Sequence, residues 1–236
     1  MALKLHLKKR PRRPVIIEGF PGFGIVGGIS TQYIIDHLNM ELIGSFFSEK
    51  VPAVVAVHNK KMVPPIGIYY SQEHNLLVVH PVITFPGLEW SFSTALLKLA
   101  KELKAREIIS IEGVTSFSEE VKTYYYTNSE KLKERLNSLN LEEFKEGIIV
   151  GPTATLLATA ENFPVVCIFA ETSIEPQDAR SAAKALEVLD KYLNLGIDTK
   201  PLLKEAGKFE KHLKQIIKQS LEAMDVKKKK ELSYVG

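Results

Sequence analysis

The chain has 236 residues, 45% of them hydrophobic, so it can bury a full core as one large domain or as a domain with an appendage. A formal net charge of +3 is mild for this length and gives no reason to expect nucleic acid as a partner. The single cysteine excludes a disulfide framework within the chain and fits a reducing cytoplasm.

The N-terminal charges have no continuous apolar segment behind them, so we do not expect a secretory signal. No run approaches the roughly 18 apolar residues of a membrane span. Abundant lysine and glutamate with scarce cysteine are more typical of a thermophile. We therefore expect a soluble cytoplasmic protein that has no membrane partner.

The first third of the chain predicts short strands around one helix. Residues 3–8 alternate leucine with lysine or histidine, which is the period of a strand with one buried face. A buried strand over 15–19 then precedes a helix over 25–37. Further strands are predicted at 42–47, 54–58, 66–70 and 76–80. Turn signals at 63–66 and 72–75 make this part a meander.

The middle and later parts alternate helices with strands. Helices are predicted at 89–104, 129–139 and 176–194, with a further helix start at 151–153. Strands are predicted at 107–111, 121–126, 148–150 and 165–170, the last holding a buried Cys167. This alternation predicts an α/β fold in which helices flank a mixed, largely parallel sheet.

The last forty residues differ from the rest. An apolar stripe at helical spacing includes Leu202, Phe209, Leu213 and Ile216. Such a C-terminal helix could cover its own sheet domain or pack on a partner subunit, and both interpretations stay open. We predict an α/β domain over 1–198, this helix over 199–226 and a flexible basic tail over 227–236.

The stretch GFPGFGIVGG, residues 19–28, contains the pattern G-x-G-x-x-G after an apolar run. A dinucleotide site also needs an acidic residue that ends the next strand and binds ribose. Glu41 precedes its predicted strand, Glu49 lies several residues too far along, and Pro21 removes a backbone N–H from the turn. The sequence therefore does not support binding of a dinucleotide cofactor.

Another interpretation fits the same stretch. Gly19, Gly22 and Gly24 permit a tight turn, while Gly27 and Gly28 allow the helix to approach the sheet closely. The helix start could also hold an anion. Phe20 and Phe23 flank Pro21 and would be exposed unless something covers them, which suggests a partner surface. We predict an interaction loop formed by Gly19, Phe20, Pro21, Gly22, Phe23 and Gly24.

Three blocks of the sequence resemble the proteasome-assembly-chaperone family in its archaeal branch. The first is GFPGFGIVGGISTQYII, which is similar to the family's opening motif, and the second is GPTATLL at 151–157. The third is Ala170-Glu171 followed by EPQDA at 175–179, where Gln177-Asp178 departs from the usual order. The blocks occur in the expected order and span roughly residues 14–200.

The resemblance implies an α/β fold similar to nucleoside phosphorylases, in a non-enzymatic chaperone or activator that docks on the α-ring of the proteasome core. It also implies self-association, as a ring or cluster. Some members dock through a C-terminal hydrophobic–Tyr–any-residue ending. The corresponding residues here are Leu232, Ser233, Tyr234, Val235 and Gly236. The tyrosine is one residue out of register, about 3.3–3.6 Å of extended chain.

Other chemistry has little support in the sequence. The six histidines form no i, i+4 pair, Cys167 has no CxxC partner, and neither a Walker A lysine nor a G-x-S-x-G elbow occurs. We expect no metal and no cofactor. An enzyme would depend on a phosphorylase-like pocket built from Glu112, Thr153 and Glu171, near strand ends and a helix start. Each of these could instead cap a turn, cap a helix or pair with lysine.

Three hypotheses follow. The first is a non-enzymatic, self-associating protein that docks on the proteasome core. The second is a scaffold that keeps the family body but has lost that docking and assembles with a different protein. The third is a small-molecule enzyme of nucleoside-phosphorylase character.

Overall fold

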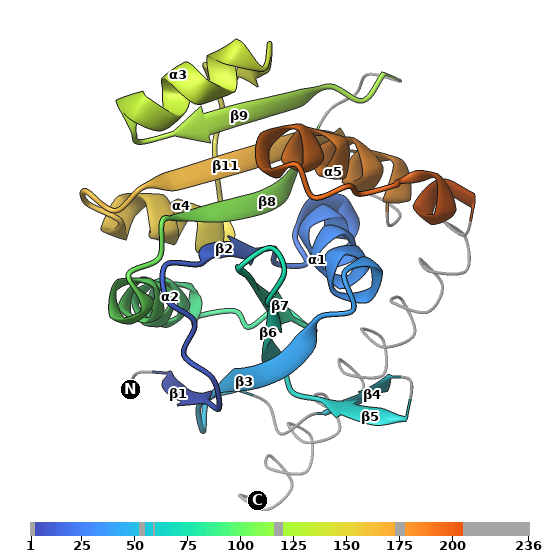
Figure 1. The fold of residues 1–236 in the computed structure, drawn as a ribbon. Helices are drawn as coiled ribbons and strands as arrows, with labels where there is room; N and C mark the ends of the chain where they lie inside the picture. The colour runs from blue at the N-terminus through green and yellow to red at the C-terminus, as the bar shows by residue number, and fades with distance from the viewer. Residues whose placement is uncertain (1–2, 52–54, 59, 116–119, 173–177, 205–236) are drawn as a thin grey trace, which may run out of the picture.

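The computed structural model describes residues 3–51, 55–58, 60–115, 120–172 and 178–204, except for the side chains of 58 and 61. A nine-stranded sheet forms its centre, with strand order β1-β3-β6-β7-β2-β8-β11-β9-β10 (Figure 1). The bounds are β1 Lys4–Leu7, β2 Val15–Glu18, β3 Glu41–Phe47, β6 Ile66–Ser71, β7 Leu76–Pro81, β8 Glu107–Thr115, β9 Thr123–Thr127, β10 Glu142–Glu143 and β11 Val165–Thr172. A separate hairpin pairs β4 (Ala56–His58) with β5 (Lys61–Val63).

The sheet is mixed, as predicted. Its central neighbours β7, β2, β8 and β11 are parallel, and β3, β6 and β7 form the predicted antiparallel meander. Strand β2 is apolar apart from its last residue and is buried along its whole length. This is typical of a parallel strand that is covered on both faces.

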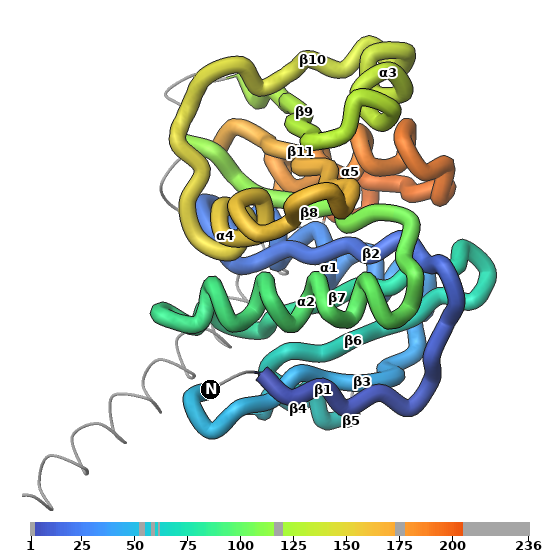
Figure 2. The backbone as a smooth tube through the Cα atoms, turned by 90° about the vertical axis from the view of Figure 1, so that its left-hand side faces the viewer, coloured from blue at the N-terminus to red at the C-terminus, as the bar shows by residue number. Residues whose placement is uncertain are grey.

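Helices cover both faces of the sheet. They are α1 (Val26–His37), α2 (Glu89–Leu103), α3 (Glu130–Ser138), α4 (Gly151–Thr159) and α5 (Ala179–Leu193). Helices α1 and α5 pack with Val15 and Ile17 of β2 on one face, while α2 and α4 pack with Ile16 on the other. Figure 2 shows α2 and α4 in front of the sheet. Alternate residues of a single strand therefore supply two separate cores.

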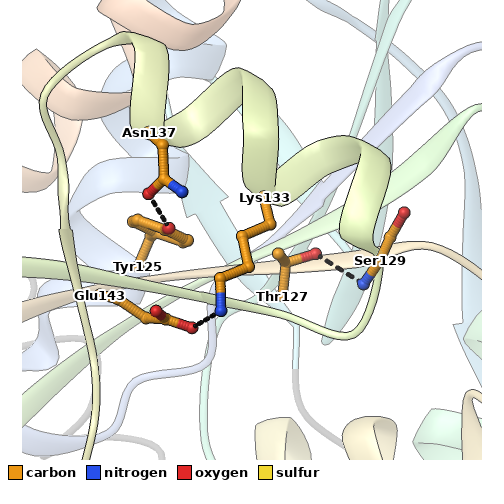
Figure 3. A network of polar contacts seen from close by, with 6 residues as sticks. All are labelled: Tyr125, Thr127, Ser129, Lys133, Asn137 and Glu143. Atoms are coloured by element: carbon orange, nitrogen blue, oxygen red, sulfur yellow. Dashed lines mark hydrogen bonds and ion pairs between the residues drawn. The ribbon is translucent and has the colours of Figure 1, made fainter.

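Helix α3 covers the edge of the sheet at β9 and β10. The Tyr125 hydroxyl donates to Asn137 Oδ1 at 2.5 Å, and Lys133 Nζ donates to Glu143 Oε1 at 2.6 Å. Figure 3 shows these contacts linking the helix to both strands. They attach an edge element that has only Leu136 fully buried.

Two sequence predictions need correction. The predicted buried strand at 148–150 is wrong: Ile148 is 88% exposed, Val150 is 47% exposed, and neither lies in a strand. Three apolar residues are too few to distinguish a strand from an exposed segment that leads into a helix. Strand β8 also continues past its predicted end, because Glu112 and Gly113 pair with Phe169 and Ala170 of β11.

The predicted C-terminal helix begins within the described residues, since 200–204 are helical. Leu202 is buried in the core on the side of α1 and α5. At this position the helix covers its own domain. Phe209, Leu213 and Ile216 lie outside the described residues, as does the tail over 227–236.

Candidate functional site

The glycine stretch forms the loop between β2 and α1 and includes a short 3-10 turn, Phe23–Ile25. Gly24 has φ +59°, and a Cβ there would overlap the side chain of Thr172 at the end of β11. Its carbonyl accepts a hydrogen bond from the backbone N–H of Asp178 at 2.9 Å. The loop therefore needs glycine at this position, both for its backbone conformation and for the close approach.

Asp178 joins the third sequence block to this loop. Its carboxylate accepts hydrogen bonds from the backbone N–H groups of Arg180 and Ser181, at 3.1 and 3.0 Å, and so caps α5. It also accepts from Thr172 Oγ1 at 3.0 Å. Asp178, where the block departs from the family order, is thus the N-cap of α5.

The second block starts α4 beside the same loop. Pro152 lies in the first turn of the helix, as the sequence predicts. Thr155 Oγ1 is 2.6 Å from Ser93 Oγ of α2 and donates to the carbonyl of Glu89 at 3.1 Å. The fold therefore brings together three blocks that are far apart in sequence.

Two phenylalanines of the loop have different roles. Phe20 is buried, with its ring at 4.5 Å from that of Phe92 in an edge-to-face arrangement. Phe23 is 40% exposed. Of the two rings predicted to lie on a partner surface, only Phe23 is accessible.

We expect Phe20→Leu to lower the free energy of unfolding by about 1–2 kcal/mol, because it removes an aromatic contact from the core. Phe23→Leu should change it by less than about 0.5 kcal/mol, since that ring is partly in solvent. Urea denaturation of both variants measures the difference. Equal losses for the two variants would contradict these placements.

The loop, the start of α4 and the segment before α2 enclose a hollow of about 480 Å³. Its wall is mainly aromatic and aliphatic and includes Phe20, Phe23, Phe85, Leu88 and Phe92. Val150 in this wall is half exposed, and Trp90, next in sequence to the lining residue Glu89, is 61% exposed. Exposed apolar groups beside a concave surface are typical of an interaction site.

Glu112 of β8 contributes a carboxyl group to this hollow, although the side chain is only 7% exposed. Burial raises its pKa to about 7, and a hydrogen bond with the Thr153 side chain opposes that rise. Thr153 also lies 2.8 Å from Ser110, Oγ1 to Oγ. The structure therefore brings the predicted residues Glu112 and Thr153 into contact.

Glu18 is a further buried carboxyl group, which the sequence analysis missed. Burial raises its pKa to about 8; the Ser110 side chain opposes this rise, and Glu112 adds to it. Neither of its carboxylate oxygens has a hydrogen bond that meets normal geometry within the described residues. The signal in the sequence was a glutamate that directly follows three buried apolar residues of a strand.

Glu171 is held differently. Its carboxylate accepts from the Tyr124 hydroxyl at 2.9 Å and from the backbone N–H of Lys122 at 3.4 Å. It lines a second hollow of about 530 Å³ that also reaches Glu112 and Phe23. The polar contacts of Glu171 attach the segment of β9 to β11, and both of these donors are other than a lysine side chain.

The described sheet does not have the strand arrangement that a dinucleotide-binding site requires. The strand that follows α1 is β3, which pairs antiparallel with β1 and β6 and is not a neighbour of β2. Glu41 at its start pairs with Lys9 at 2.5 Å on the surface. The strand that follows α1 therefore places no ribose-binding acidic residue beside β2.

Among the described residues, no group of three or more histidine, cysteine, aspartate or glutamate side chains could hold a metal ion. None of the helices in this part of the chain is long and apolar enough to cross a membrane.

The fold and the loop together define the class: a three-layer α/β/α protein in which a glycine loop, the start of α4 and the cap of α5 meet beside an apolar hollow. The model of the PAC2 family matches residues 16–217, and the chain belongs to this family.

Solved structures with the same fold cover most of the chain. PbaA of Pyrococcus furiosus, described as an archaeal homolog of proteasome-assembly chaperone, has a TM-score of 0.85 and 29% identity, covering 94% of this chain and 99% of that one. PbaB of the same organism, described as an archaeal proteasome activator, is similar in fold, with a TM-score of 0.74, 23% identity and coverage of 91% and 98%. An uncharacterized protein of Methanocaldococcus jannaschii is 28% identical over 224 residues, covering 94% of this chain and 93% of that protein.

Proposed function

We propose that this chain is a non-enzymatic interaction protein of the proteasome-assembly-chaperone type, which self-associates and docks on the α-ring of the proteasome core. The observation that carries the proposal is the likeness to PbaA over nearly the whole of both chains, at 29% identity. Membership of the PAC2 family supports it. The three family blocks also meet at one place in the fold, beside the exposed Phe23.

Exposed apolar side chains support self-association. The β4–β5 hairpin is separate from the main sheet, and Val57 and Met62 on it are 69% and 62% exposed. Side chains of this kind, grouped on a two-stranded hairpin, are costly to leave in water and are stabilised when a second subunit covers them. We therefore place part of the subunit interface on this hairpin.

Self-association is tested by size-exclusion chromatography with light scattering at micromolar concentration. The full chain should elute with the mass of a closed oligomer. Val57→Lys and Met62→Lys together should shift it toward the monomer, whereas lysine substitutions at the exposed Gln72 and Glu73 should not. A strictly monomeric full chain would contradict this part of the proposal.

Docking is tested by peptide hydrolysis with an archaeal proteasome core particle. The full chain should raise the rate of hydrolysis, and a variant that ends at Lys230 should not, because docking is assigned to residues 232–236. Tyr234→Ala should lose the effect, while Tyr126→Ala, at an exposed tyrosine of β9, should keep it. Equal activation by the full chain and by the shortened variant would show that the tail is not the docking element.

The alternative is a scaffold that keeps the family body and assembles with a different protein. The displaced Tyr234 favours it, because a pocket that reads both the ring and the terminal carboxylate would meet them one residue out of register. An oligomer that neither activates nor co-sediments with the core particle would support the scaffold.

A further inference from the structure

The lining of the hollow beside the glycine loop includes Glu112, whose side chain is 7% exposed. Its Oε2 is buried and has no hydrogen bond within the described residues. A Cβ on Gly22 would lie 3.1 Å from Glu112 Oε1, so the carboxyl group sits directly under the loop. Leaving a buried acceptor unpaired costs about 1–3 kcal/mol, more when the group is charged.

The walls around this carboxyl group are apolar. Phe20, Phe23, Phe85 and Phe92 contribute four aromatic rings, and Leu88 adds an aliphatic side chain. The volume of about 480 Å³ falls within the usual range for pockets that hold small organic molecules. Thr84 and Glu89 also line the hollow, and an apolar cavity with a few convergent polar groups orients a ligand by those groups and gains affinity from the rest.

The buried carboxyl groups at this hollow determine which charge a ligand can carry. Glu18 and Glu112 are two neighbouring buried carboxyl groups, and each would repel an anion when it is ionised. A cation would form a charge-assisted hydrogen bond with Glu112, and aromatic faces attract cations. An aromatic body would gain offset or edge-to-face contacts with the phenylalanine rings of the lining.

We propose that this hollow is a binding site for a small organic cation with a flat apolar body, of the aryl amidine or arylalkylamine class, whose N–H groups donate to the carboxyl group of Glu112 in its lining. This inference concerns a ligand rather than a protein partner, so it does not depend on docking to the proteasome. At pH 8 a carboxyl group with a pKa of about 7 is mostly ionised and available to such a cation.

Three probes that share a benzene ring distinguish the effect of charge on affinity from the effect of shape. Benzamidine is cationic, benzamide is neutral and nearly isosteric, and benzoate is anionic. Titrations at pH 8, followed by calorimetry and by thermal stability of the full chain, should show benzamidine binding at least tenfold more tightly than benzamide, with no binding of benzoate. Equal affinity for the three probes, or no binding of benzamidine at 10 mM, would overturn the proposal.

Substitutions locate the site. Glu112→Gln should weaken benzamidine at least tenfold and leave benzamide nearly unchanged, whereas Glu73→Gln, in an exposed turn, should affect neither. Phe23→Ala removes a partly exposed ring, so the chain should still fold and should bind benzamidine about threefold more weakly. Benzamidine affinity that is unchanged in both Glu112→Gln and Phe23→Ala would place the ligand elsewhere and overturn the assignment.

A guanidinium group could also come from an arginine of a protein partner. An acetylated Gly-Arg-Gly amide carries that head group without the flat body, and it should bind at least tenfold more weakly than benzamidine. Tighter binding of the peptide than of benzamidine would overturn the small-molecule assignment and point to a partner's side chain.

Discussion

Gly27→Ala is expected to lower the free energy of unfolding by more than about 3 kcal/mol, or to prevent folding. A Cβ at this position would overlap the carbonyl oxygen of Ile111 in β8 and come within 2.6 Å of that of Phe20. Both obstacles are backbone atoms, so no change of side-chain rotamer relieves the overlap. Relief would require α1 to move away from the sheet and from the loop that it anchors.

Gly28→Ala in the same helix is the matched control. A Cβ there would lie 3.1 Å from a methyl group of Ile25, which is a side chain that can shift. Alanine also favours a helix by about 0.5–1 kcal/mol over glycine, so this variant should remain within about 1 kcal/mol of the parent. Guanidinium denaturation compares the two variants. Similar stabilities for both would contradict the close packing of α1 on β8.

Stability should fall as the pH rises from about 5 to above 8, because of Glu18. Its pKa is raised from 4.5 to about 8 in the folded chain, so the folded state holds this proton more tightly than the unfolded state does. The stabilisation is fully present below pH 4.5 and is lost as the pH rises through 8. The loss amounts to roughly 5 kcal/mol. Glu112 acts in the same direction between 4.5 and about 7.

Glu18→Gln removes this titration while keeping the shape of the side chain. The measurement is the free energy of unfolding of parent and variant at pH 5, 7 and 8.5. The free energy of unfolding of Glu18→Gln should increase relative to that of the parent as the pH rises. Glu73→Gln, at an exposed position, should have the same free energy of unfolding as the parent at every pH. Parallel pH curves for the parent and Glu18→Gln would show that Glu18 is not buried in this way.

Local patterns predicted most elements but not their order in the sheet. Apolar runs identified β2 and β11, and helical periodicity identified α2 and α5, since these signals depend only on neighbouring residues. The placement of β2 between β7 and β8 depends on contacts between distant segments. The two-residue strand β10 is too short for any periodic signal.

The candidate site was predictable in part. The glycine loop, Glu112 and Thr153 were identified from sequence, because helix starts and strand ends have recognisable residues. The sequence did not identify Glu18 as a neighbour of these residues. The register of the parallel strands places Glu18 of β2 beside Ser110 of β8, two residues before Glu112. A single sequence does not reveal this register, and so the paired burial of Glu18 and Glu112 became visible only in the fold.

Sedimentation velocity of the full chain mixed with an archaeal proteasome core particle tests the central claim most directly. We expect a fraction of the chain to sediment with the core particle at micromolar concentration, and this fraction to disappear when the chain ends at Lys230. The same distribution for the mixture as for the two separate components would contradict the proposed docking on the α-ring.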